Sequence, residues 1–257
     1  MNLTDSDILK FMAGEPILFE DICAVYSATL REIIEVGYNN FQQYLNIILF
    51  EKPSLINDTE ELAILNQLSD FQYLLITTTL DSKMNQLVKD AFYFFTHETV
   101  SFSLDPAQII FGPLEEKHIL TEEKFYDLQT LIKRMYFIEL DGEQITIFST
   151  DSPITRKLKE KMRANREKLQ RAKAKQNKKN KTDLQFSDLI GSICINNCGL
   201  NMSNIFDITY YAFQDQLKRM GWRDQFDINQ RAALAGAKIH KSQLKHWMRS
   251  IASSDKS

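Results

Sequence analysis

The spacing of apolar residues predicts helices through most of the first 100 residues. Apolar positions recur every three or four residues, and several of the segments end at residues that terminate helices, such as Gly37 and Pro53. Asp58 and the two glutamates after it suit the positive end of a helix dipole. The four predicted helices span residues 19–37, 38–53, 58–71 and 82–95.

The pattern then changes to shorter runs with residues that favour strands. Residues 99–104 and 107–112 flank Asp105-Pro106 and predict a hairpin. A helix is expected over 121–135, and a second hairpin is expected around Asp141-Gly142. Residues 96–150 therefore look like a small α+β unit attached to a helical one.

Residues 156–181 differ sharply in composition from the rest of the chain. They hold 13 Lys and Arg against two Glu, with no Gly, Pro or aromatic residue. Such a composition favours helix and predicts a solvated, basic, partly helical linker between two domains.

The last part, from 184 onward, is predicted to be a three-helix bundle. Its central helix would carry Phe206, Tyr210, Phe213, Leu217 and Met220 on one stripe and end at Gly221. A second helix over about 224–235 would end at Gly236, and a third would place Leu244, Trp247, Met248 and Ile251 on one face. The predicted fold is therefore mainly α with a small α+β part, divided into 1–150, 151–183 and 184–257.

Charge is distributed unevenly between the two halves. Residues 1–150 contain 9 Lys and Arg against 24 Asp and Glu, and residues 151–257 contain 22 against 10. The split predicts two parts with different surroundings, which could also attract each other. No stretch is long and apolar enough to span a bilayer, and the acidic start does not suit a signal peptide, so we expect a cytoplasmic protein without a membrane partner.

The motifs of the common enzyme classes are missing from the sequence. It has no glycine-rich phosphate loop, no GxSxG and no HExxH, and its eight glycines are few for a nucleotide-binding enzyme. The three cysteines imply no disulfide framework, and the spacing of Cys194, Cys198, His240 and His246 does not suit zinc. We expect no catalytic residue, no metal, no cofactor and no enzymatic activity.

The basic run raises the alternative of a regulator that binds nucleic acid, because clustered Lys and Arg release counterions from phosphates. The absence of interleaved aromatic residues weakens this hypothesis relative to a solvated linker. Nucleic acid would be contacted by Arg156, Lys157, Arg163, Arg166, Arg171, Lys173, Lys178 and Lys179.

Large rings are concentrated between residues 205 and 222. Most of them fall on the predicted core stripe of the central helix, but Tyr211 lies off that stripe. Tyr211 is therefore predicted to contact a partner protein. Trp222, which comes just after Gly221, and Trp247 are predicted partner contacts as well.

Three stretches carry a family resemblance, namely LQFSDLIGSI (184–193), NMSNIFDITYYAFQDQLKRM (201–220) and LAGAKIHKSQLKHWM (234–248). They resemble the C-terminal part of proteins encoded in the tail-morphogenesis clusters of phages and prophages of Gram-positive bacteria. REIIEVGYNNFQQYLNIILF (31–50) and FYDLQTLIKRMYFI (125–138) extend the likeness over most of the chain.

The resemblance implies a tail assembly chaperone that acts by protein binding in the host cytoplasm. Its implied partners are the tape-measure and tail-tube proteins, with homo-oligomerisation also open. A structural component that stays in the virion is the other role that this resemblance allows.

Overall fold

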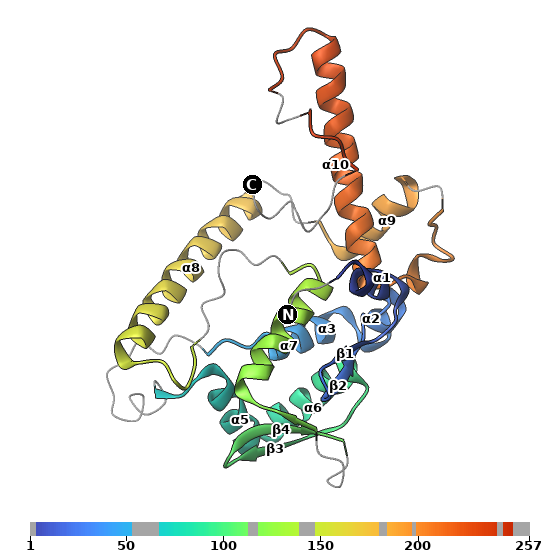
Figure 1. The fold of residues 1–257 in the computed structure, drawn as a ribbon. Helices are drawn as coiled ribbons and strands as arrows, with labels where there is room; N and C mark the ends of the chain where they lie inside the picture. The colour runs from blue at the N-terminus through green and yellow to red at the C-terminus, as the bar shows by residue number, and fades with distance from the viewer. Residues whose placement is uncertain are drawn as a thin grey trace.

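The computed structural model describes residues 4–52, 67–112, 118–138, 147–179, 184–196, 199–240 and 244–248, but not the side chains of 167 and 169–179. The elements are α1 (Asp5–Ala13), β1 (Ile17–Phe19), β2 (Cys23–Val25), α2 (Leu30–Val36), α3 (Tyr38–Ile48), α5 (Asp70–Leu80), α6 (Ser82–Thr96), β3 (Val100–Leu104), β4 (Ala107–Phe111), β5 (His118–Leu120), α7 (Glu122–Met135), α8 (Pro153–Lys179), α9 (Phe186–Asn196), the 3₁₀ turn η1 (Ile205–Asp207) and α10 (Tyr210–Leu234). The fold is mainly α with two small antiparallel sheets, as predicted (Figure 1).

The helix predicted over 19–37 is correct only in its second half. Residues 17–25 form the β1–β2 hairpin, in which Ile17 pairs with Val25. Ile17 and Phe19 are buried while Leu18 between them is 74% exposed, which is the period of a strand. The helix α2 begins after Thr29, whose hydroxyl and Glu32 form a capping box.

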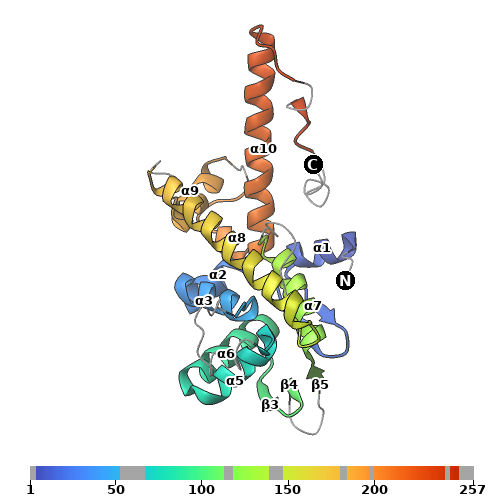
Figure 2. The ribbon, with the colours of Figure 1, turned by 90° about the vertical axis from the view of Figure 1, so that its left-hand side faces the viewer.

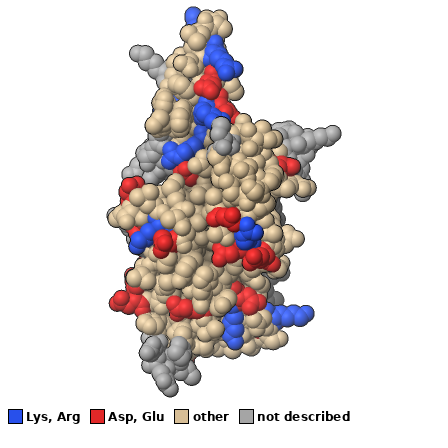
Figure 3. All heavy atoms as spheres, turned by 90° about the vertical axis from the view of Figure 1, so that its right-hand side faces the viewer, with Lys and Arg blue, Asp and Glu red and all other residues tan. Residues whose placement is uncertain are grey.

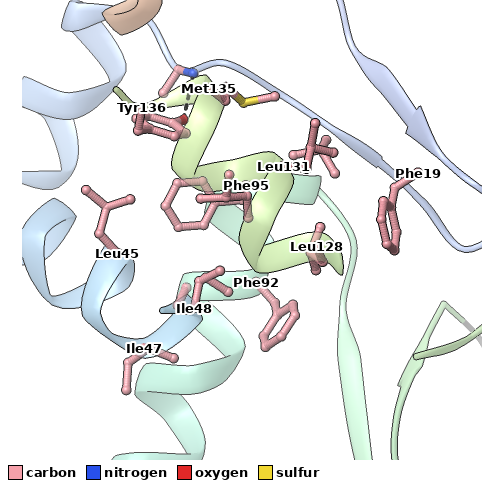
Figure 4. Packing of buried hydrophobic residues seen from close by; sticks show 14 of the residues in the cluster. Phe19, Leu45, Ile47, Ile48, Phe92, Phe95, Leu128, Leu131, Met135 and Tyr136 are labelled. Atoms are coloured by element: carbon pink, nitrogen blue, oxygen red, sulfur yellow. Dashed lines mark hydrogen bonds between the residues drawn. The ribbon is translucent and has the colours of Figure 1, made fainter. Parts of the chain in front are cut away.

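The main core lies between α3, α6 and α7. Figure 4 shows Leu45 and Ile48 from α3, Phe92 and Phe95 from α6, and Leu131 from α7 directed toward one another. These helices agree with the predicted ones at 38–53, 82–95 and 121–135, because each has a clear apolar face.

A buried hydrogen bond connects the end of α7 to the segment that precedes α2. The backbone N–H of Ala28 donates to the hydroxyl oxygen of Tyr136 (2.9 Å), which in turn donates to the carbonyl of Tyr26 (3.3 Å). Burial, the largest cause, raises the pKa of Tyr136 well above its ordinary range, so its hydroxyl stays protonated.

The hairpin predicted at 99–112 is confirmed. Strands β3 and β4 pair antiparallel from Val100–Phe111 to Leu104–Ala107, and β5 adds to the other edge of β4. The second predicted hairpin, around Asp141-Gly142, and most of the helix predicted over 58–71 lie outside the described residues.

Helix α8 contains residues 156–179 of the basic run and crosses the body of the molecule (Figure 2). The side chains of Arg156, Arg163 and Arg166 point toward the body of the protein. Ile154 and Leu158 on the same helix are instead 84% and 58% exposed. The prediction of a solvated linker therefore fails for the first half of α8, because its charged face is the one that packs against the protein.

The strongest contact of α8 is a buried ion pair with α5. Arg163 donates to both carboxylate oxygens of Asp70, at 2.8 and 2.5 Å, and the two side chains are 3% and 1% exposed. Asp70 also accepts the backbone N–H groups of Lys52 (3.0 Å) and Ile147 (3.3 Å). Four donors thus converge on one buried carboxylate.

The predicted C-terminal three-helix bundle is wrong for the described residues. Helix α10 does not end at Gly221 but runs unbroken from Tyr210 to Leu234, and its second half projects away from the body (Figure 1). Gly221 has an ordinary helical φ, and a Cβ built there would meet nothing within 4 Å. A glycine inside a helix costs only about 1 kcal/mol, which the flanking helix formers offset.

Helix α10 ends at Leu234, just before Gly236, the residue that the sequence predicted to end the second helix. Gly236 has φ +90°, its N–H donates to Ala233, and the N–H of Ala237 donates to Ala232. This is the Schellman arrangement that a left-handed residue allows.

The division into 1–150, 151–183 and 184–257 remains a prediction, but the described core crosses its boundaries. The N–H of Tyr210 donates to Ala28 (2.8 Å), and Leu30 donates to Ile208 (3.0 Å). Phe213, Ile193 and Ile205 belong to the same buried cluster as α3 and α7. The start of α10 is therefore part of the main body.

Candidate protein-binding groove between α9 and α10

A groove of about 370 Å³ lies where α9 meets the middle of α10. Its apolar lining comes from Ile193 on α9, Met220 on α10, and Trp247 in the C-terminal segment. We call these residues, together with the polar ones described next, the α9–α10 groove. A size of this order suits a few side chains of a protein partner.

The polar lining of the groove is positively charged. Arg219 and Arg223 lie one helical turn apart on α10, with Gln216 and Asn196 as neutral neighbours. Arg219 is held by Asp215, whose Oδ2 accepts its Nε–H at 2.7 Å. Asp215 is only 3% exposed, whereas Arg219 is about one third exposed, so the guanidinium is the part available at the groove.

The third wall of the groove exists because the chain turns back after Gly236. Residues 237–240 and 244–248 lie alongside the projecting part of α10, as Figures 1 and 2 show. The ring of His246 contacts Phe226 (centroids 5.2 Å apart) and stacks on Trp247 (5.6 Å). Residues 244–248 contain no α-helix, so the predicted third helix with Leu244, Trp247 and Met248 on one face is not formed there.

Two of the three predicted partner-binding residues lie in this region. Trp247 is half-buried and lines the groove, and Trp222 is half-buried on α10 with the Lys218 ammonium 5.7 Å from its ring centre.

Farther along the projecting part of α10, Ile228 and Leu234 are 61% and 83% exposed. On the face that Figure 3 draws, Lys and Arg lie along this projection together with some acidic side chains, and most of the charged side chains on the body below are acidic.

The prediction that Tyr211 faces a partner is wrong. Its ring packs against Phe11 (5.3 Å) and Phe137 (4.6 Å), and the residue is 7% exposed. The first turn of α10 is covered on more than one side, so a residue off the main stripe is buried as well. Burial raises the pKa of Tyr211 to about 12, with a smaller contribution from the charge of Asp215.

The residues predicted to contact nucleic acid differ in where the structure places them: three are directed at the protein and one is exposed. Arg163 is buried, which contradicts its predicted role. Arg156 donates to the carbonyls of Gln67, Phe148 and Ser149, and Arg166 pairs with Glu51, so both are directed at the protein. Lys157 is exposed on α8. The side chains of Arg171, Lys173, Lys178 and Lys179 lie outside the described residues.

No group of three or more His, Cys, Asp and Glu in the described ranges is placed to hold a metal ion. None of the described helices combines the length and the apolar character that a bilayer span requires.

The sequence did not point to Ile193, Met220, Arg219 or Arg223 as a site. Met220 falls on the predicted core stripe, Ile193 is buried in the core of the structure, and the two arginines carry no motif. The groove depends on α10 continuing past Gly221 and on the position of Trp247 beside α10, and neither feature follows from apolar spacing.

Residues 175–252 match the family model described as the YomV second domain, which covers 78 of the 257 residues. The match supports a phage-type protein. No curated protein and no solved structure gives a significant match to the chain. All the residues that line the α9–α10 groove lie inside the matched range.

Proposed function

We propose that this protein is a phage assembly factor that acts by binding another phage structural protein in the α9–α10 groove, without catalysis. The observation that carries the proposal is that this groove, with an apolar base and two arginines, lies wholly within the segment that matches the YomV second domain. The resemblance of residues 184–248 to tail-morphogenesis proteins makes tail assembly the process that we propose.

The chemistry of the groove indicates what a partner segment must offer. Met220 and Trp247, which are half-buried, provide apolar surface for a large apolar side chain, while Ile193 is 1% exposed and belongs to the core that the groove adjoins. Arg219 and Arg223 favour carboxylates beside them. An amphipathic helix with acidic flanks meets both requirements, because apolar residues at i, i+3 and i+4 share one face. Tape-measure and tail-tube proteins of the same phage are the partners to test.

The test is co-expression of the full chain with the tape-measure and tail-tube proteins encoded beside it, followed by affinity purification. We expect one of the two to co-purify. Trp247→Ala should weaken that complex about thirtyfold or more, since a tryptophan at the centre of an interface contributes about 2 kcal/mol or more. Met248→Ala is the matched control, because Met248 is 69% exposed and lies outside the groove.

Two outcomes would overturn the proposal: neither tail protein co-purifies with the wild-type chain, or Trp247→Ala binds as well as Met248→Ala. Mass spectrometry of purified phage particles then separates an assembly factor from a virion component. An assembly factor is absent from mature particles, whereas a structural component is present in fixed stoichiometry.

A further inference from the structure

A second pocket, of about 250 Å³, lies on the acidic body between the segment 26–28, α2, α3 and α6. It contains no residue of the range 175–252, and the proposed function makes no use of it. Its lining combines aromatic rings with carboxylates, and none of the described residues that line it is Lys or Arg.

The rings come from three parts of the chain that the fold brings together. Tyr26 stacks on His97 with ring centres 4.1 Å apart, and Tyr44 contacts Phe94 at 5.6 Å. Tyr93 is 56% exposed beside His97 and adds a fifth ring to the lining. His97 holds its place because it ends α6 in a left-handed conformation (φ +58°) and its N–H donates to Tyr93.

The carboxylates are Glu32, Glu35 and Asp90. The Glu32 carboxylate accepts the N–H and hydroxyl of Thr29 through Oε2, and Asp90 accepts the Gln86 amide through Oδ1 (2.7 Å). These hydrogen-bond donors are neutral, so they bring no positive charge to either carboxylate. Three carboxylates beside aromatic faces create a negative potential in a pocket with a partly apolar lining.

We propose that this pocket binds an alkylammonium group, as carried by a lysine side chain or by a free diamine. The ring faces attract the cation, the carboxylates pair with it, and the apolar parts of Tyr44 and Phe94 contact its methylene chain. The volume suits one such chain and is smaller than that of a typical pocket for a drug-sized ligand, about 300–1,000 Å³. An anion is disfavoured by all three carboxylates.

The test is saturation-transfer NMR titration of the full-length chain with three probes. The probes are N-acetyl-lysine methylamide, 1,5-diaminopentane and the uncharged N-acetyl-norleucine methylamide. We expect saturable binding of at least one of the two amines and none of the norleucine compound. Binding of the lysine compound identifies a protein side chain as the ligand, and binding of the diamine alone identifies a free amine.

Variants locate the binding and separate charge from the ring faces. Glu35→Gln combined with Asp90→Asn should weaken the amine about tenfold, and Tyr93→Leu should weaken it several-fold by removing an aromatic face. Glu123→Gln combined with Asp127→Asn removes the same charge from α7, outside the pocket, and should leave the affinity unchanged. The proposal is overturned if neither amine saturates, if the norleucine compound binds equally, or if both double variants bind alike.

Discussion

The buried ion pair between Asp70 and Arg163 allows a quantitative prediction about how α8 is held. Both side chains are almost fully buried, and Asp70 is also the acceptor for two backbone N–H groups from other segments. Burial alone would lower the pKa of Arg163, but its hydrogen bonds to Asp70 and the charge of Asp70 raise it, so the guanidinium stays protonated.

Removing one partner leaves the other charge buried without its counter-charge. Such changes cost about 3–5 kcal/mol, which is a large part of the 5–15 kcal/mol that typically stabilises a folded domain. In a protein of this size each kcal/mol lowers the melting temperature by about 2–4 °C, so Arg163→Met and Asp70→Asn should each lower it by roughly 6–20 °C. A surface arginine would show almost none of this loss.

The assay is urea unfolding monitored by circular dichroism, for both single variants and for the double variant. The double variant should lose less than the sum of the two single losses, because it leaves no unpaired charge. Lys157→Met, on the exposed side of the same helix, is the matched control and should keep the wild-type midpoint. The reasoning is refuted if Arg163→Met costs less than about 1 kcal/mol, the upper range for exposed pairs, or if the single losses add fully.

Two further predictions concern a buried lysine and two glycines. Burial, the largest cause, lowers the pKa of Lys133 from its ordinary 10.5 to about 8. Between those pH values the unfolded chain therefore binds more protons than the folded one, and the free energy of unfolding should rise with pH by at most about 3 kcal/mol. Urea unfolding at pH 8 and pH 10 should show this rise in the wild type and not in Lys133→Met. An equal rise in the wild type and in the variant would contradict the prediction. Gly221→Ala should slow amide hydrogen exchange in α10 by stabilising the helix about 0.5–1 kcal/mol. Gly236→Ala should speed exchange at the end of the helix, because φ at Gly236 is +90°. If both substitutions speed exchange, or both slow it, the different roles given to the two glycines are refuted.

Local sequence patterns predicted the elements whose apolar faces meet the body of the protein. Helices α3, α6 and α7 and the β3–β4 hairpin all follow from spacing and turn residues. The resemblance in residues 184–248 also anticipated the phage-type match. These features are encoded within a few turns of chain, so they need no knowledge of distant contacts.

The tertiary structure decided what those patterns could not. The hairpin at 17–25 replaced half of a predicted helix, because Ile17 and Val25 are buried in the core as a strand pair. The basic run turned its arginines inward because Asp70, 93 residues away, supplies a buried counter-charge for Arg163. No periodicity within the run distinguishes this face from a solvated one.

The same division holds for the candidate sites. The sequence alone singled out Trp222, which comes just after the stripe that ends at Met220, and it also named Trp247. The sequence pattern placed Tyr211 at the surface, because the apolar spacing within one helix does not show which other segments pack against its remaining faces. The α9–α10 groove and the pocket near Tyr26 each join segments that are distant along the chain. Only the packing of those segments brings an apolar base next to arginines, or aromatic rings next to carboxylates.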